Sequence, residues 1–406
     1  MEVLVRRIFF LLLLGVSLKG APAPLLLISM DAFRWDYCDL HPNETPHLRA
    51  LRESGASAKA LIPVYPSNTF PNHYTIVTGL WPAHHGMINN NMFDPTLGLF
   101  FHNNQVAATH DSRWWGGEPI WVTAEKQGYA SACSFWPGSE AEVGGHQPTY
   151  WKTYDYSVPF EKRLDELVGW LKAPAEKRPL VAAFYLEETN SQGHTFGPDS
   201  PELLAAIQLL DTRLGVILDR LKGEGITVNL VIVSDHGMTD VSLDRVVVLD
   251  DYLEMSQVQL DFDGPEAGLR PVGNATVDSI MAALAKLPPQ VKAYRAEDLP
   301  ERFHLKNNPR IPPIWIAAEQ GWGIYRNSYL NTVRSHFHRG EHGYDPALES
   351  MRGILIVNGP AFKSGGVSIA PVENIHLYNL LCGALRLKPA PNDGDDRLVK
   401  ALLKAK

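Results

Sequence analysis

Cysteine is scarce in this chain, with only three residues in 406, at Cys38, Cys133 and Cys382. Three cysteines cannot supply the dense disulfide framework that stabilises small exported domains. Cys133 lies in a β-like stretch and Cys382 on an apolar helix face, so we expect both to be buried packing residues, although spacing alone leaves a bridge open. A hydrophobic content of 45% over this length is enough to build a large core.

The chain also lacks an excess of basic residues, since 37 Lys and Arg stand against 45 Asp and Glu, a formal net charge of -8. A protein that coats DNA or RNA neutralises phosphates with a basic surface, so binding of a nucleic-acid polymer is disfavoured. A single mononucleotide held through metal ions remains compatible with this charge. No obligate protein partner is evident from the composition.

Long hydrophobic runs are missing after the first residues. Arg6 and Arg7 precede an apolar run over residues 8–18, and small residues follow as far as Ala23. This order predicts a signal peptide over residues 1–23, the alternative being a retained membrane anchor. Because no later apolar stretch approaches ~18 residues, we expect an exported protein, periplasmic or secreted, with no stable membrane anchor after cleavage.

Short apolar runs alternate with segments of helical periodicity along the rest of the chain. The predicted strands cover residues 25–29, 129–135, 180–186, 228–233 and 354–357. The predicted helices cover residues 119–127, 159–172, 202–222 and 373–385, with a further helix from Pro46 that begins at a Thr45 cap and stops at Gly55. Fully apolar strands alternating with helices predict an α/β fold, a mainly parallel central sheet with helices on both faces. Residues 24–406 are predicted to form a single catalytic domain, in which the less regular residues 241–340 supply insertion and cap elements.

Six polar side chains follow the predicted strands or come from the irregular region: Asp31, Asn190, His194, Asp235, His236 and His342. Ligands of open α/β sheets bind at the carboxyl ends of strands, so these side chains are expected to meet at one edge. Carboxylates and imidazoles without cysteine suit Zn²⁺ in a hydrolytic site. Each motif alone has a plainer interpretation, because Asp235-His236-Gly237 is also typical of a turn and His194 of a loop.

Thr69 is the candidate nucleophile. It precedes Pro71, which favours the first turn of a helix whose apolar face includes Ile76 and Leu80. The plainer interpretation is a hydroxyl that caps this helix. The same position also suits catalysis, because backbone N–H groups and the helix dipole favour an alkoxide and an anionic phosphoryl group there. A bound Zn²⁺ would lower the pKa of the hydroxyl further.

Taken together, these residues resemble the nucleotide pyrophosphatase/phosphodiesterase family of the alkaline phosphatase superfamily. The matching motifs occur in the family's order over nearly the whole chain after residue 23, and they are Met30-Asp31-Ala32-Phe33-Arg34, Thr69-Phe70-Pro71-Asn72-His73-Tyr74, Val77-Thr78-Gly79-Leu80, His85-Gly86-Met87-Ile88, Phe135-Trp136-Pro137-Gly138, Glu187-Glu188, Gly193-His194, Ser234-Asp235-His236-Gly237-Met238 and His342-Gly343-Tyr344-Asp345.

The resemblance implies an alkaline-phosphatase-like fold and an enzyme with two Zn²⁺ per chain that hydrolyses phosphodiester or pyrophosphate bonds of nucleotides. Thr69 would act as nucleophile through a phospho-threonine intermediate, and a nucleoside 5′-monophosphate would be released. The implied ligands of one zinc are Asp31, Asp235, His236 and the Thr69 oxygen, and those of the other are His194, His342 and the residue at position 190. Among the substrate-binding residues, Asn90 would bond the phosphoryl oxygen, while Phe70 and Tyr154 would hold the nucleobase between them.

Position 190 departs from the family pattern, because the family has aspartate where this chain has Asn190. Two zinc ions would bring four positive charges, and Asp31, Asp235 and a Thr69 alkoxide would offset three of them. The zinc held by His194 and His342 should then bind more weakly. Glu188 lies two residues earlier, about 6.6 Å along an extended chain, and is not expected to substitute.

Two other functions remain as alternatives at this stage. A phosphodiesterase of the same fold could act on choline-bearing lipids or glycerophosphodiesters, because aromatic cages for quaternary ammonium groups also use rings such as Phe70 and Tyr154. A catalytically weak nucleotide-binding protein is suggested by Asn190. The presence of Thr69 and both metal histidines argues against the second alternative.

Overall fold

The computed structural model describes residues 22–405, so the predicted signal peptide lies almost entirely outside the described residues. Within the described part of the chain, no helix is both long and apolar enough to cross a membrane. All three cysteines are buried and unbridged, as predicted for Cys133 and Cys382. Burial raises the pKa of the Cys38 and Cys382 thiols to about 12, which makes both unreactive.

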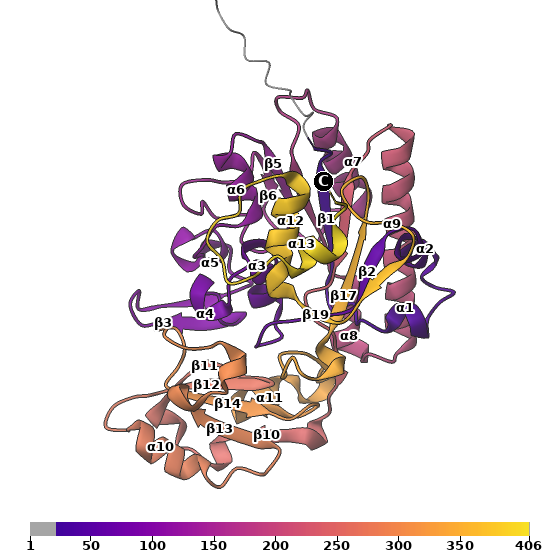
Figure 1. Ribbon diagram of the computed structural model, residues 1–406. Coiled ribbons are helices and arrows are strands. Elements are labelled where there is room, and N and C mark those ends of the chain that lie inside the picture. The colour runs from indigo at the N-terminus through magenta and orange to yellow at the C-terminus, as the bar shows by residue number, and fades with distance from the viewer. Residues whose placement is uncertain (1–21, 406) are drawn as a thin grey trace, which may run out of the picture.

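A nine-stranded sheet forms the centre of the molecule (Figure 1). Its strands follow the spatial order β18 (Val367–Ile369), β2 (Ala56–Ile62), β17 (Gly353–Asn358), β8 (Asn229–Val233), β1 (Leu25–Met30), β7 (Val181–Leu186), β5 (Ser131–Ser134) and β6 (Tyr150–Lys152), with β19 (Val372–Glu373) paired to β2. Only β17 runs against its neighbours; β8, β1, β7, β5 and β6 pair in parallel. The predicted mainly parallel sheet is therefore confirmed.

The central strand β1 shows why the sheet is covered on both faces. All six of its residues are buried, and its five apolar residues are divided between two hydrophobic clusters. Leu25 and Leu27 belong to one cluster, whereas Leu26, Ile28 and Met30 belong to the other. Successive side chains of a strand point to opposite faces, so an uninterrupted apolar run needs a helical layer on each side.

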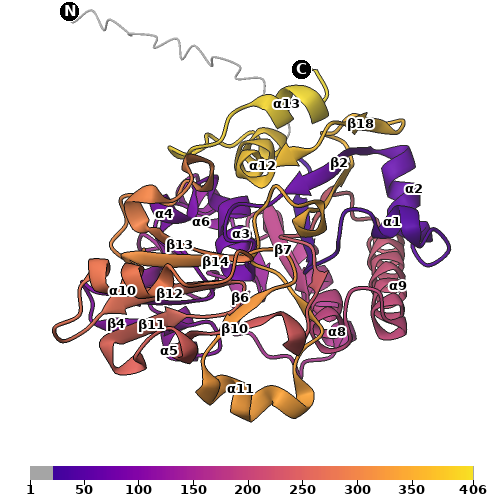
Figure 2. The ribbon, with the colours of Figure 1, turned by 90° about the horizontal axis from the view of Figure 1, so that it is seen from below.

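The two helical layers come from different parts of the chain (Figures 1 and 2). Residues of α3 (Thr69–Thr78), α4 (Pro82–His85), α5 (Val106–Thr109), α6 (Ile120–Lys126), α12 (Leu377–Leu385) and α13 (Arg397–Leu402) lie in the first cluster. Residues of α1 (Tyr37–Leu40), α2 (Pro46–Ser54), α7 (Phe160–Leu171) and α9 (Pro201–Gly223) lie in the second. A short hairpin, β3 (Asn91–Asp94) with β4 (Leu99–His102), completes this part of the fold.

The start of α2 differs from the prediction. Thr45 occupies the N-cap position, but its hydroxyl donates to the carbonyl of His41 and caps nothing. Asp211 of α9 accepts hydrogen bonds from the backbone N–H groups of His47 and Leu48, at 3.0 and 2.8 Å. A carboxylate from a neighbouring helix thus satisfies the free N–H groups and favours the positive end of the helix dipole.

Residues 241–340 are more regular than their Pro, Gly and Asp content indicated. They contain a four-stranded antiparallel sheet in the order β11 (Val258–Phe262), β12 (Glu266–Pro271), β14 (Ile314–Ala318) and β13 (Val291–Arg295), backed by α10 (Val277–Leu284). Two further elements, β10 (Val246–Val248) and β15 (Gly323–Tyr325), pair in parallel. This part and the two residues that follow it, Glu341 and His342, are together called the cap below. The cap has a hydrophobic cluster of its own and lies beyond one end of the central sheet (Figure 1).

The cap is joined to the central part by both apolar and polar contacts. Tyr65 stacks on Phe303, with ring centroids 3.8 Å apart, and its hydroxyl accepts a hydrogen bond from Trp315 Nε1 at 2.9 Å. Glu266 of β12 accepts hydrogen bonds from the side-chain amides of Asn68 and Asn89. Since Asn68 is the residue before Thr69, the cap helps to position the start of α3.

Glu266 predicts a pH-dependent stability. Burial raises the pKa of its carboxyl from 4.5 to about 8, so folding takes up a proton between these values and stability falls as pH rises through that window. In urea unfolding, Glu266→Gln should match the parent near pH 4.5 and exceed it by roughly 2–4 kcal/mol at pH 8.5. The exposed Glu254 provides a control, because Glu254→Gln should unfold like the parent. An equal difference between Glu266→Gln and the parent at both pH values would contradict the assignment.

Candidate active site

Three neighbouring strands of the central sheet end beside one another and deliver the predicted side chains. Asp31 follows β1, Asp235 and His236 follow β8, and β7 leads into α8 (Glu188–Phe196). The strands are parallel and adjacent, so their carboxyl ends share one edge of the sheet. The cap adds β16 (Gly340–Glu341), which pairs with β9 (Thr239–Asp240) and brings in His342.

Asp31, Asp235 and His236 form the first group of candidate metal ligands. Their ligand atoms lie within 4.8 Å of one another, and all three residues are buried. His236 Nε2 lies 3.0 Å from Asp235 Oδ2 and 3.5 Å from Asp31 Oδ1. Asp31 Oδ1 accepts no hydrogen bond. A buried carboxylate oxygen without a donor is costly, and a cation at this position would satisfy it.

Surrounding side chains fix the orientation of this group. Tyr185 donates its hydroxyl to Asp31 Oδ2 at 2.6 Å, and Ala32 donates its N–H to Asp235 Oδ1 at 3.2 Å. His236 Nδ1 bonds the Gly237 carbonyl, which turns Nε2 towards the carboxylates. Hydrogen bonds of this kind set the tautomer and direction of metal ligands.

The charges of the group compete for protons. Burial raises the pKa of Asp31 to about 7, and the nearby Asp235 carboxylate adds to this effect. Burial also opposes ionisation of Asp235, but His236 and His73 outweigh it and hold that pKa well below its usual range. Burial lowers the pKa of His236, whereas Asp235 raises it, to a net value of about 9. Bound protons thus offset the repulsion between the two carboxylates of this group. Its carboxylate oxygens and imidazole nitrogen are also atoms that zinc commonly binds.

Thr69 lies directly beside this group. It is the first residue of α3, after Asn68 at the N-cap, and only 8% of it is exposed. Its Oγ1 lies 3.2 Å from His236 Nε2. The hydroxyl therefore faces the candidate metal ligands. The plainer interpretation, in which Thr69 caps the helix, is wrong, because Asn68 occupies the N-cap position.

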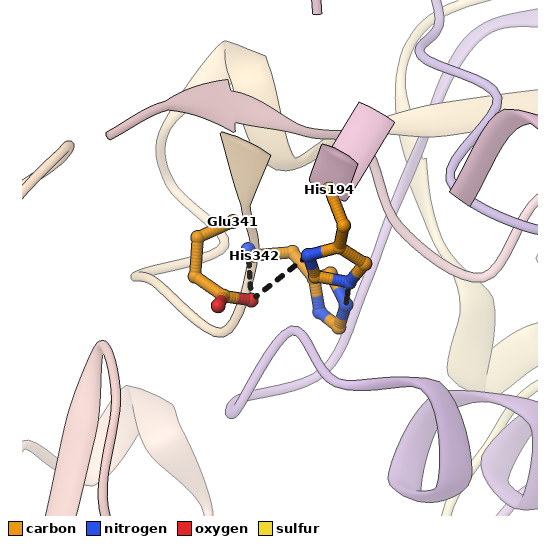
Figure 3. Close-up of side chains that lie close together, drawn as sticks. All are labelled: His194, Glu341 and His342. Atoms are coloured by element: carbon orange, nitrogen blue, oxygen red, sulfur yellow. Dashed lines mark hydrogen bonds and ion pairs between the residues drawn. The ribbon is translucent and has the colours of Figure 1, made fainter. Parts of the chain in front are cut away.

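His194 and His342 form a second group (Figure 3). Their Nε2 atoms lie 3.1 Å apart. His194 Nδ1 bonds the Gly340 carbonyl at 2.9 Å, and His342 Nδ1 bonds the Ser67 carbonyl at 3.0 Å. Both Nε2 atoms therefore present lone pairs to the same point. Two nitrogens on one tetrahedral zinc are about 3.3 Å apart, given Zn–N bonds of about 2.05 Å, so the pair fits this metal.

Asn190, predicted as the third ligand of this group, comes from the same helix as His194. Both residues lie on α8, four positions apart and so on one face, and not in a loop after β7. Asn190 Oδ1 is buried and accepts no hydrogen bond. Glu188 cannot replace it, because its carboxylate is paired with Arg213 of α9. As the predicted third ligand beside two imidazoles, Asn190 offers a neutral amide oxygen.

Glu341 is a neighbour of this group that the sequence did not single out. Its Oε1 accepts the His342 N–H at 3.0 Å and lies 3.7 Å from His194 Nδ1, while its Oε2 lies 3.1 Å from His338 Nε2 (Figure 3). Burial raises the pKa of this carboxyl, but the three histidines outweigh burial and hold it below its usual range. The only signal in the sequence was its position next to His342.

A cavity of about 370 Å³ opens beside Thr69 and includes both predicted aromatic residues, Phe70 and Tyr154, together with Asp31 and Asn190. Its size is within the range of small-molecule sites. Asn90, which lies outside this cavity's lining, accepts the Phe70 N–H with its Oδ1 at 2.8 Å. That contact leaves the amide Nδ2 group of Asn90 as the donor for a ligand oxygen. The structure thus brings Asp31, Asp235, His236 and Thr69 together and pairs His194 with His342, while Phe70, Tyr154 and Asn190 line one cavity beside them.

Comparison with known proteins places these residues in a family. The family model described as "Type I phosphodiesterase / nucleotide pyrophosphatase" matches residues 25–345. Among curated relatives, the venom phosphodiesterase of Macrovipera lebetinus is 41% identical and covers 94% of this chain. The ectonucleotide pyrophosphatase/phosphodiesterase family member 3 of Rattus norvegicus is 38% identical, also over 94% of this chain. The chain spans 45% and 44% of the lengths of these two relatives.

Solved structures agree with this assignment. Murine ectonucleotide pyrophosphatase/phosphodiesterase 5, described as inactive and in complex with AMP, superimposes with a TM-score of 0.88 at 36% identity. The human protein of the same name gives a TM-score of 0.89 at 36% identity. Each comparison covers 94% of this chain and 100% of the other. The chain therefore belongs to the nucleotide pyrophosphatase/phosphodiesterase family of the alkaline phosphatase superfamily.

Proposed function

We propose that the protein is a zinc-dependent phosphodiesterase that hydrolyses phosphodiester or pyrophosphate bonds of nucleotides and releases nucleoside 5′-monophosphates. The observation that carries this proposal is the position of Thr69, whose Oγ1 lies 3.2 Å from His236 Nε2 at the start of a helix. The names of the relatives support nucleotide diesters and anhydrides over choline-bearing lipids as substrates. Export of the enzyme, to the periplasm or outside the cell, is part of the same proposal.

Two Zn²⁺ ions, when bound, would neutralise the charge that develops on the phosphoryl, attacking and leaving oxygens. Asp31, Asp235 and His236 would hold one ion together with Thr69, and Asn190, His194 and His342 would hold the other. The first set and the pair of His194 and His342 correspond to the two groups of donor atoms, and the orphaned buried oxygens of Asp31 and Asn190 are compatible with bound cations.

Hydrolysis is proposed to proceed by two in-line displacements. Thr69 Oγ1, after loss of its proton, attacks phosphorus, and the bond from phosphorus to the leaving oxygen breaks. Water then attacks the phospho-threonine, and the bond from phosphorus to Oγ1 breaks. The amide of Asn90, oriented by the Phe70 N–H, donates to a phosphoryl oxygen during both steps. The N-terminal end of α3 stabilises the same negative charge.

The nucleoside is proposed to occupy the cavity between Phe70 and Tyr154. Phe70 is supported by ring contacts with Phe101 and Trp115, whereas Tyr154 is 46% exposed at the opening. One rigid and one accessible ring would allow a base to enter and stack. AMP in the related murine structure supports a nucleotide in this family's site.

Replacement of the nucleophile tests the chemistry. Thr69→Ala should lower kcat for thymidine 5′-monophosphate p-nitrophenyl ester at least about 10³-fold, because no covalent intermediate can form. The variant should still bind zinc and AMP, as measured by elemental analysis and calorimetry. Thr69→Ser retains the hydroxyl and serves as the control that keeps measurable turnover. Unchanged turnover in Thr69→Ala would remove the proposed mechanism.

The proposed base site predicts a substrate-dependent effect. Phe70→Ala and Tyr154→Ala should each reduce kcat/KM for the thymidine ester by about 5- to 150-fold, which corresponds to 1–3 kcal/mol of stacking. Hydrolysis of bis(p-nitrophenyl) phosphate, which has no nucleobase, measures the effect of the same changes on the chemistry itself. An equal loss with both substrates would argue against a base site between these rings.

A further inference from the structure

Two divalent ions in the proposed site would leave one positive charge uncompensated. They carry four positive charges, and the anionic donors are Asp31, Asp235 and the Thr69 alkoxide. The excess falls on the group of His194 and His342, because Asn190 contributes a neutral oxygen there. An uncompensated charge in a buried site is costly, so an anion close to this group is expected.

We propose that Glu341 supplies this missing negative charge and acts through His194 and His342 as a charge-balancing and positioning residue. The inference rests on the proposed two-zinc function. It assigns to a cap residue the electrostatic task that aspartate at position 190 would otherwise perform.

The geometry places Glu341 next to the imidazoles and away from their metal-facing atoms (Figure 3). Its Oε1 lies 3.7 Å from His194 Nδ1, whereas the two Nε2 atoms face each other. The His194 Nδ1 atom is hydrogen-bonded to the Gly340 carbonyl, so Glu341 acts by its negative charge, which stabilises a cation bound at the opposite ring nitrogen. The His342 N–H and His338 Nε2 hold the carboxylate in place, and its side chain is only 17% exposed. Limited solvent screening makes its charge effective over this distance.

Other nearby carboxyl groups are already committed. Glu188 is paired with Arg213. Glu266 accepts hydrogen bonds from Asn68 and Asn89, and burial raises the pKa of its carboxyl to about 8, so it carries little charge near neutral pH. Among the described residues, Glu341 is the carboxylate that has an oxygen within 4.8 Å of ring nitrogens of both His194 and His342. Its carboxylate therefore fits the vacant electrostatic role best.

Zinc binding to the metal-free full chain tests the proposal without reliance on turnover. The protein is titrated with buffered Zn²⁺, and bound metal is counted by elemental analysis. The parent should bind two equivalents. Glu341→Gln, which keeps the shape and removes the charge, should weaken the second equivalent about 10- to 100-fold and leave the first within about 3-fold.

Two further variants separate charge from shape. Glu341→Asp keeps the charge and should bind the second zinc within about 3-fold of the parent. Asn190→Asp combined with Glu341→Gln has the parent's total charge and should recover the affinity that Glu341→Gln loses. Glu188→Gln is the matched control, because it removes a carboxylate from the same helix, two positions before Asn190, and should not change zinc affinity. Should Glu341→Gln fail to fold, Glu341→Asn replaces it in the same series.

The outcomes divide clearly. Parent-like affinity for the second zinc in Glu341→Gln overturns the proposal, as does a loss in Glu341→Asp as large as that in Glu341→Gln. A parent that never binds a second equivalent overturns both this inference and the two-zinc function. A parent that binds two equivalents, with the expected effects in the variants, supports the inference even if it hydrolyses no nucleotide diester; that result would count against the proposed function alone.

Discussion

Two carboxylates buried side by side, Asp31 and Asp235, are the constraint on which the rest of the site depends. Neither has access to water, and each faces His236. Such an arrangement repels itself unless positive charge is present, either as protons or as a metal ion. The parallel strands β1 and β8 make the arrangement unavoidable, because they are neighbours and both end at this point. The site is thus a direct product of the order of strands in the sheet.

The cap has two roles in this arrangement. Its apolar contact with the central part is made by aromatic residues, of which Tyr65 and Trp315 are hydrogen-bonded to each other. Its polar contact is made by Glu266 and by the turn that carries Glu341 and His342. One half of the second metal group therefore depends on how the cap docks. Movement of the cap relative to α8 would separate the two histidine nitrogens and weaken that metal site selectively.

Asn190 distinguishes the proposed metal site from the family pattern, which has aspartate at this position. The two proposed donor sets are unequal, since the first has two carboxylates and the second would have two imidazoles and the amide of Asn190. Unequal donor groups imply unequal affinities for a divalent ion. In the proposed two-zinc function, occupancy of the second position is the step at which zinc supply would control activity. The contact between Glu341 and His194 reduces this inequality.

The sequence by itself determined the central sheet and most of the site. Apolar strands between amphipathic helices predicted the α/β fold, because the periodicity of buried residues is a local property. Asp31, Asp235 and His236 were expected at one edge of the sheet because they follow predicted strands, whereas the resemblance to the family implied the division of the ligands between two zinc ions.

Only the tertiary structure decided features that depend on residues distant in the chain. Asp211 caps a helix more than 160 residues away, and Glu341 approaches His194 across a similar interval. The antiparallel sheet of the cap was not predicted, because the many Pro, Gly and Asp residues of this region are typical of irregular structure and its strands are short. These contacts arise from docking between elements, and docking leaves no periodic pattern in the sequence from which it could be predicted.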